Sequence, residues 1–137
     1  MVIVCERGNN WAIALRFALQ ESRLRVFETR TWADSIAAWE QSPQSVIAIE
    51  LRTNNLVEVV RNLAELRRRS SGAAAVVLAE REMAECEWIV REAGAIYVAR
   101  SKRNLSPLAR LLVRAVDSRM SLSLEPADAG AAEPKTE

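Results

Sequence analysis

The chain of 137 residues is long enough for one ordinary domain and too short for two. Half of its residues are hydrophobic, which is enough to bury a core, and no apolar run approaches the ~20 residues that a membrane span needs. The net charge is +1, but the segment after Met120 holds four carboxylates and one lysine, so residues 1–120 carry about +4. A charge of this size does not by itself indicate nucleic-acid binding.

The chain contains no histidine and only two cysteines, Cys5 and Cys86. Without histidine, a Ser-His-Asp triad and a Cys2His2 zinc site are both excluded. The two cysteines have mainly apolar neighbours, and we interpret them as reduced core thiols in a reducing compartment. The first residues lack the basic region and the long apolar run of a secretory signal peptide, so we expect a cytoplasmic protein without membrane contact.

Five short apolar runs alternate with helical patterns along the chain. They cover residues 2–5, 24–27, 46–51, 74–79 and 95–99. Each is four to six residues long and several are rich in Val and Ile, which is typical of strands buried on both faces of a parallel sheet. The second run is the most polar, because Arg25 and Glu28 lie in or beside it, and we expect it at an edge of the sheet.

The segments between these runs show helical periodicity and helix-end signals. Asn9 or Asn10 can cap a first helix that extends to about Ser22. Thr31 opens a capping-box-like start for the second helix, which ends before Pro43. The other three helices are expected from Asn54 or Asn55 to Arg67–Arg69, from about Arg81 to Gly94, and from an N-cap at Ser106 with Pro107 at the first helical position. Alternating β and α units predict an α/β fold of three layers, a doubly wound parallel sheet with helices on both faces.

The C-terminal segment, residues 121–137, differs in composition from the rest of the chain. It has few bulky apolar residues and is interrupted by Pro and Gly. Such a segment buries too little apolar surface to offset the entropy lost on ordering. We therefore expect one domain of residues 1–120, followed by a disordered tail.

Ligands of an open α/β sheet bind beyond the carboxyl ends of its strands, so the residues at those ends are the candidates for a site. One such end is the run from Ala93 to Arg100 (AGAIYVAR). This run, the five strand-helix units and their spacing make residues 1 to about 120 resemble a bacterial response-regulator receiver domain. The resemblance implies a flavodoxin-like fold with strand order 2-1-3-4-5. It also implies that Arg100 takes the place of the receiver active-site lysine and Tyr97 that of the switch aromatic residue.

The same resemblance assigns the other positions of a receiver phosphorylation site. Glu50 falls at the phosphoacceptor aspartate, Cys5 and Glu6 at the metal-binding acidic pair, and Ala79 (or Leu78) at the switch Thr or Ser. Glu50 is one methylene too long, Cys5 offers Mg²⁺ no hard oxygen, and Ala79 has no hydroxyl. Arg100 replaces a compact ammonium with a planar fork. We therefore expect lost phosphorylation, no cofactor or metal and no enzyme activity, with Glu50 paired to Arg100 in one fixed state.

Receivers bind partners, or each other, through the fourth helix, the fifth strand and the fifth helix, and the resemblance implies this face here. The residues expected to bind a partner are Glu82, Glu85 and Trp88 on the fourth helix and Arg110 and Arg114 on the fifth helix. A two-fold interface would set the acidic fourth helix of one copy against the basic fifth helix of the other. We interpret the chain as a stand-alone protein-interaction module of signalling. The other interpretation of the same charges is two ordinary solvated helix faces.

Three further functions stay open. The loop from Glu6 to Asn10 leads into a helix N-terminus that could receive an anion, so a small-molecule or nucleotide binder on a flavodoxin-like fold is the main alternative, although neither GxGxxG nor GxxxxGK[ST] occurs. The basic run Arg67–Arg69 and the basic fifth helix could contact nucleic acid, which is disfavoured because the chain has no recognition module or stacking platform. Glu6 and Glu50 could also form the carboxylate pair of an enzyme.

Overall fold

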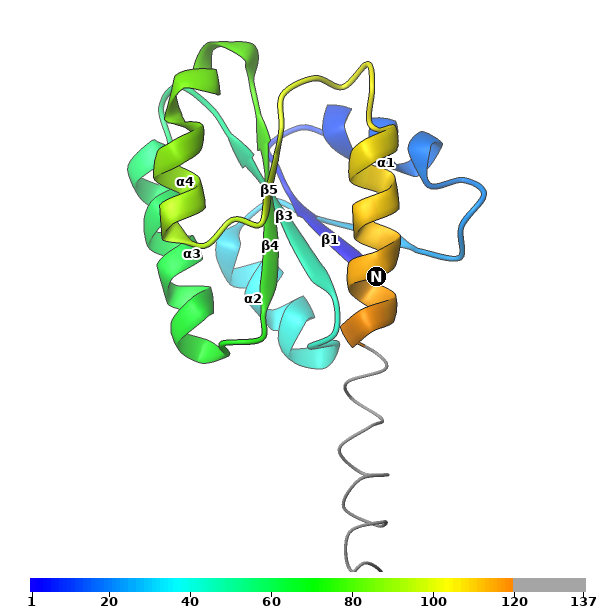
Figure 1. Ribbon diagram of the computed structural model, residues 1–137. Helices are drawn as coiled ribbons and strands as arrows, with labels where there is room; N and C mark the ends of the chain where they lie inside the picture. The colour runs from blue at the N-terminus through cyan, green and yellow to red at the C-terminus, as the bar shows by residue number, and fades with distance from the viewer. Residues whose placement is uncertain (120–137) are drawn as a thin grey trace, which may run out of the picture.

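The computed structural model describes residues 1–119, which form a five-stranded parallel sheet between two layers of helices (Figure 1). The strands are β1 (Val2–Cys5), β2 (Val26–Thr29), β3 (Val46–Leu51), β4 (Ala74–Ala79) and β5 (Tyr97–Ala99). The helices are α1 (Asn10–Ala18), α2 (Trp32–Gln41), α3 (Leu56–Arg69) and α4 (Glu87–Ala93), with a 3-10 helix, η1 (Arg81–Cys86), before α4 and a last helix described over residues 106–119. The strand order is β2-β1-β3-β4-β5, as predicted. The expected tail, residues 121–137, lies outside the described residues.

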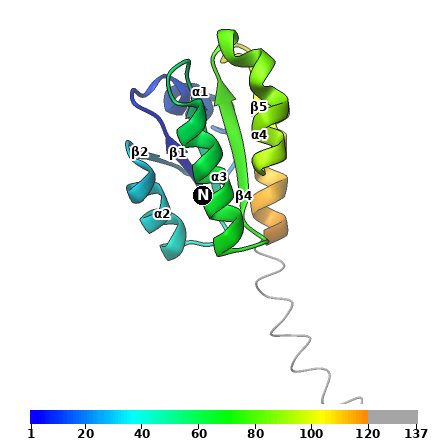
Figure 2. The ribbon, with the colours of Figure 1, turned by 90° about the vertical axis from the view of Figure 1, so that its left-hand side faces the viewer.

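Each face of the sheet carries its own core, because successive strand residues point to opposite faces. On one face α1 and the last helix pack with Trp11, Leu15, Leu108 and Leu112 on alternate residues of β1, β3 and β4. On the other face α2, α3 and α4 cover the strand residues that alternate with these. Figure 2 shows α2 and α3 in front of the sheet. Strands β3 and β4 are almost entirely buried, which is why their apolar runs predicted their bounds correctly.

The edge strand β2 begins two residues later than predicted and continues through polar residues to Thr29. The residues before it form a turn in which the Ser22 hydroxyl donates to the Leu19 carbonyl and accepts from the Leu24 N–H. The expected position at the sheet edge is confirmed. The polar residues belong to the strand because one of them, Thr29, is buried and donates to the Val4 carbonyl of β1 at 3.0 Å.

Three helix boundaries also differ from the prediction. The first helix ends at Ala18 rather than near Ser22. The segment predicted as one helix up to Gly94 divides into η1 and α4, and η1 starts with an i to i+3 hydrogen bond from the Met83 N–H to the Glu80 carbonyl. In the last helix the Leu105 carbonyl accepts from the Ala109 N–H at 2.7 Å, so Leu105, instead of Ser106, takes the N-cap. Within the described residues, no helix is both long and apolar enough to cross a membrane.

Candidate functional site

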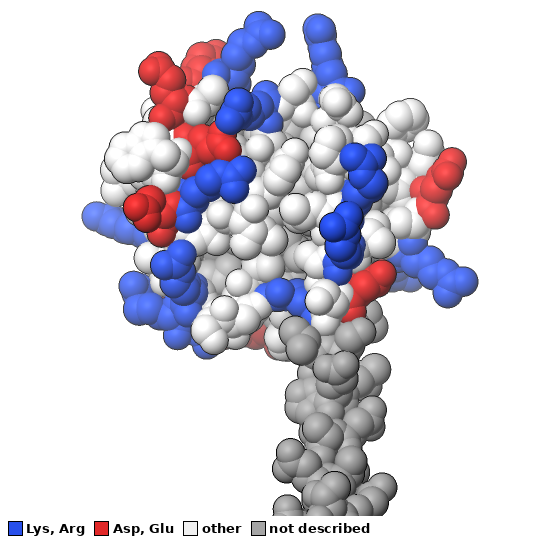
Figure 3. Space-filling view, in the orientation of Figure 1, with Lys and Arg blue, Asp and Glu red and all other residues white. Residues whose placement is uncertain are grey.

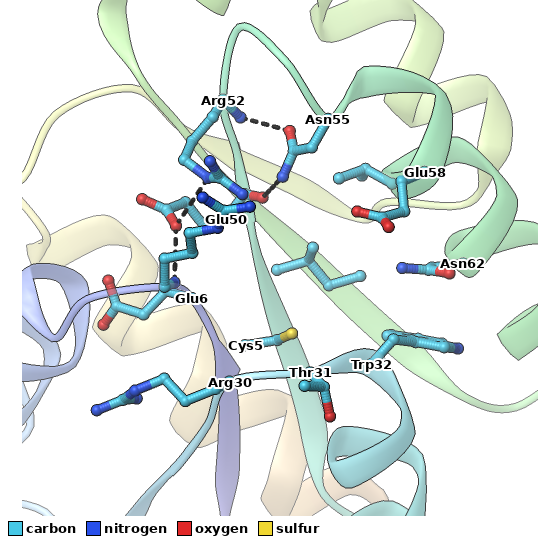
Figure 4. A pocket seen from close by; sticks show the side chains of 13 residues that line it. Cys5, Glu6, Arg30, Thr31, Trp32, Glu50, Arg52, Asn55, Glu58 and Asn62 are labelled. Carbon is cyan, nitrogen blue, oxygen red and sulfur yellow. Dashed lines mark hydrogen bonds and ion pairs between the residues drawn. The ribbon is translucent and has the colours of Figure 1, made fainter.

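The carboxyl ends of β1 and β3 open into a cavity of about 240 Å³ between the first turns of α2 and α3 (Figure 4). Cys5 and Glu50 lie in its wall, as the resemblance implied, together with Glu6. The wall contains as many arginines as carboxylates, so it has no net charge. The charged and polar side chains are Glu6, Arg7, Arg30, Thr31, Glu50, Arg52, Asn55, Glu58 and Asn62.

The Glu6 carboxylate is used inside the fold, where it caps the N-terminus of α1. Its two oxygens accept hydrogen bonds from the backbone N–H groups of Trp11 (3.1 Å) and Ala12 (2.8 Å), and the residue is 3% exposed. These groups are among the donors that a helix leaves unpaired at its start, and the helix dipole favours a negative charge there. Asn9 lies at the N-cap position, as expected, but its side chain forms no capping hydrogen bond.

This cap also answers two of the alternatives drawn from the sequence. The N-terminus of α1 was a candidate anion site, but its N–H groups already bind the Glu6 carboxylate. That interpretation of the loop from Glu6 to Asn10 was therefore wrong. In a catalytic carboxylate pair with Glu50, the Glu6 carboxylate would have to reach a substrate. It cannot do so while it is buried as the helix cap.

Glu50 is held by the loops after β1 and β3 rather than by β5. Its Oε1 atom accepts from the Arg7 backbone N–H at 3.1 Å and lies 3.3 Å from Arg52 Nε, and the side chain is 13% exposed. Asn55 closes the loop, because its Nδ2 donates to the Glu50 carbonyl (3.0 Å) and its Oδ1 accepts from the Arg52 N–H (2.6 Å). The sequence interpretation missed Arg52 and Asn55. The signal that could have found them is their position between the strand end and the α3 start, where a loop side chain can fold back on the backbone.

Arg100 does not pair with Glu50, and the predicted ion pair between them was wrong. Arg100 forms an ion pair with Glu87 of α4, which also binds Arg91 at 2.7 Å. Hydrogen bonds from Arg91 and Arg100 lower the pKa of Glu87 below its usual value. The reason is local: Glu87 begins the α4 helix that packs on β5, whereas Glu50 is held by Arg7 and Arg52 on its own side of the sheet.

Ala79 and Arg100 line a second cavity, separate from the one at Cys5, Glu6 and Glu50. The predicted convergence of all five positions on one pocket was therefore wrong. Tyr97 lies at the start of β5 and is half-buried, in a groove between α4 and the last helix. In the structure, Cys5, Glu6 and Glu50 line one cavity, and Ala79 and Arg100 line another.

Cys5 lies at the end of β1 with its sulfur directed into the first cavity (Figure 4). Burial raises the pKa of this thiol, and the Glu50 carboxylate raises it further, while hydrogen bonds with Ser35 and Thr29 act in the opposite direction. A raised pKa keeps the sulfur protonated at neutral pH and reduces its reactivity. Both Cys5 and Cys86 are free and half-buried, so they are less enclosed than the core thiols that the sequence suggested.

A receiver fold implies a divalent metal at these acidic positions, and the residues present do not fit one. Mg²⁺ needs near-octahedral oxygen ligands. Cys5 offers sulfur, Glu6 is committed to two backbone N–H groups, and Glu50 is bound by Arg7 and Arg52. Over residues 1–119, no three Cys, Asp or Glu side chains come together as metal ligands would.

The residues predicted to bind a partner lie in two places on the surface. Glu82, Glu85 and Trp88 lie on η1 and α4, and Trp88 is 67% exposed. Arg110 and Arg114 border the groove between the last helix and α1 instead of facing α4. In Figure 3 acidic and basic side chains are mixed over α4, and a largely uncharged strip separates them from the last helix.

The basic run at the end of α3 is largely engaged within the fold. Arg69 forms ion pairs with Glu40 (2.9 Å) and Glu65 (3.0 Å). Arg67 donates to the Glu92 carbonyl at 3.4 Å. These contacts tie two of the three arginines to neighbouring helices, although all three side chains remain exposed.

The sequence matches no protein-family model and no curated protein. The fold, however, is similar to that of solved receiver structures. A response-regulator receiver domain protein from Clostridium thermocellum superposes with a TM-score of 0.70 at 14% identity, covering 88% of this chain and 97% of that one. A CheY-like protein (tadZ) from Pseudomonas aeruginosa gives 0.71 at 17%, covering 83% and 97%. This chain has the receiver-like flavodoxin fold.

The signal receiver domain of a putative Luxo repressor protein from Vibrio parahaemolyticus agrees, with a TM-score of 0.71 at 15% identity over 90% of this chain and 94% of that one. The predicted fold class and strand order are thus confirmed. Identities this low establish a shared fold and no more. The chemistry of this receiver-like domain has to be argued from its own residues.

Proposed function

We propose that this receiver-like domain is a signalling module that binds protein and does not transfer a phosphoryl group. The observation that carries the proposal is the use of Glu6 as the α1 cap, because it removes the carboxylate at the position where a receiver holds its metal. Ala79 adds no hydroxyl, and Arg100 is bound to Glu87 on another helix. On this proposal the chain is not an enzyme, and it needs no cofactor.

The binding surface is the face around Trp88. Large exposed aromatic side chains are frequent anchors in protein interfaces, and Trp88 is 67% exposed. A groove of about 430 Å³ runs between α4, β5 and the last helix, with Glu87, the residue before Trp88, and Tyr97 in its wall. The ion pairs that Glu87 makes with Arg91 and Arg100 hold the rim of this groove in one arrangement.

Trp88 can be tested against a matched exposed aromatic residue, Phe17 of α1, which is 71% exposed. Sedimentation equilibrium of the full chain, at low and at high salt, is compared for the wild type, Trp88→Ala and Phe17→Ala. We expect the wild type to self-associate, Trp88→Ala to weaken the dimer at least about tenfold, as loss of an anchor does, and Phe17→Ala to leave it unchanged. A wild type that stays monomeric at both salt concentrations, or two substitutions with equal effects, contradicts this surface.

A small-molecule binder on the same fold is the second candidate. A specific observation favours it, namely a cationic cavity at the ends of β4 and β5 that none of the contacts described so far explains.

A further inference from the structure

The second cavity lies beyond the carboxyl ends of β4 and β5 and has a volume of about 420 Å³. Small-molecule sites commonly have volumes of about 300–1,000 Å³ and lie at this edge of open α/β sheets. Its wall comes from three places along the chain: the end of β4 with the start of η1, the loop after β5, and Trp11 of α1. Cys5, Glu6 and Glu50 are not part of it, so this cavity is distinct from the one at the phosphoacceptor position.

The wall of this cavity is rich in cations. It contains four cationic side chains and two carboxylates; the cations are Arg81, Arg100, Lys102 and Arg103, and the carboxylates are Glu80 and Glu82. Arg100 is bound to Glu87. Within residues 1–119 the other three cations have no ion-pair partner, and all of them are exposed. Arg81 begins η1, whereas Lys102 and Arg103 lie in the loop after β5. Two segments distant in the sequence therefore bring the three charges to one cavity.

Trp11 adds a buried donor that has no acceptor. The residue is 1% exposed, and its indole N–H finds no hydrogen-bond partner in the part of the chain that the structure describes. The indole nitrogen itself is buried, so the cavity meets other atoms of the Trp11 side chain. Lys102 Nζ lies 4.6 Å from the centroid of the same ring, which holds its ammonium beside the cavity.

We infer that this cavity binds a small anion with a phosphate group, which pairs with Arg81, Lys102 and Arg103 beside the Trp11 ring. A phosphate oxygen is a strong acceptor for such charged donors. Guanidinium groups match phosphate geometry with two parallel donors, and an ammonium adds a point charge. The site is a non-covalent one, and it stands whether or not the domain binds protein through Trp88.

The indole N–H signals of Trp11 and Trp39 provide an internal comparison. Trp39 is also buried with an unpaired indole N–H, but it lies in the core on the opposite face of the sheet. In ¹H–¹⁵N spectra of the full chain, titrated with inorganic phosphate at constant ionic strength, we expect a saturable shift of the Trp11 signal and none of Trp39. Titration with chloride alone should move neither. Equal shifts of both signals, or an unmoved Trp11 signal, would overturn the site.

Two paired substitutions test the cations without touching the core. Lys102→Gln with Arg103→Gln should weaken phosphate binding at least about tenfold, because hydrogen bonds to charged groups are strong contacts. Arg23→Gln with Arg25→Gln removes the same charge near the start of β2, at the opposite end of the strands, and should leave the affinity unchanged. Equal loss in both variants would mean that net charge alone attracts the anion, and the site would be rejected.

A parallel titration with glycerol phosphate distinguishes a phosphate monoester from free phosphate as the ligand. Tighter binding of glycerol phosphate than of inorganic phosphate supports the site and identifies a phosphate monoester as its ligand. Equal affinities support the site for the free phosphate group. If both bind Lys102→Gln with Arg103→Gln as tightly as the wild type, the proposal fails.

Discussion

Replacing Glu6 tests the contact that most constrains the carboxyl end of β1. The carboxylate accepts two hydrogen bonds from backbone N–H groups, of Trp11 and Ala12, in a position that is 3% exposed. Losing a helix N-cap costs about 0.5–2 kcal/mol. A buried donor left unpaired costs about 1–3 kcal/mol, although water can enter and reduce this. We therefore expect Glu6→Ala to lower the free energy of unfolding by about 3 kcal/mol and Glu6→Gln, which keeps one acceptor, by roughly half of that.

Urea unfolding followed by far-UV circular dichroism measures these changes. Glu82→Ala is the matched control, because Glu82 is an exposed carboxylate at the same end of the sheet, and it should change the free energy of unfolding by less than about 0.5 kcal/mol. If Glu6→Ala were as stable as Glu82→Ala, the carboxylate would not be the cap. Glu6 would then be available for other chemistry, and the reasoning about the lost metal site would fail.

Three further predictions concern stability and reactivity. Thr31→Ala should cost about 1 kcal/mol in urea unfolding, because the Thr31 hydroxyl accepts from the Asp34 N–H at 3.1 Å, whereas Thr31→Ser should cost little. The free energy of unfolding should fall as the pH is lowered below about 5, since arginine and tryptophan donors lower the folded-state pKa values of Glu28, Glu65 and Glu87 below those of the unfolded chain. No acid dependence would contradict these contacts. Cys5 should react with iodoacetamide at pH 7.5 more slowly in the folded chain than in urea, because its pKa is raised, and faster reaction in the folded chain would refute this.

The sequence predicts the buried part of this fold better than its edge. Strands β1, β3 and β4 begin and end where their apolar runs do, because these strands are almost entirely enclosed by helices. Strand β2 has a neighbour on one side only, and half of its residues are polar. Its bounds depend on the turn at Ser22 and on the buried Thr29 hydroxyl, which are tertiary contacts that no local pattern contains.

The same distinction applies to the site. The sequence analysis correctly predicted that Cys5, Glu6 and Glu50 lie at one end of the sheet, because the carboxyl ends of parallel strands lie at the same edge. The sequence analysis did not predict the partner of Arg100. A long side chain in a loop can reach several carboxylates, and Arg100 pairs with Glu87 of α4. The sequence analysis also did not predict that the Glu6 carboxylate caps α1. Glu6 lies five residues before Trp11, which is close enough for such a contact.

The central claim is that this receiver-like domain cannot transfer a phosphoryl group, and intact-mass measurement after incubation with acetyl phosphate and Mg²⁺ tests it most directly. The account predicts no Mg²⁺-dependent mass increase in the wild type. It predicts none in Glu50→Asp either, because this substitution supplies the usual acceptor but leaves Glu6 bound to α1. A stoichiometric, Mg²⁺-dependent phosphoryl adduct on the wild type that disappears in Glu50→Gln would contradict the account.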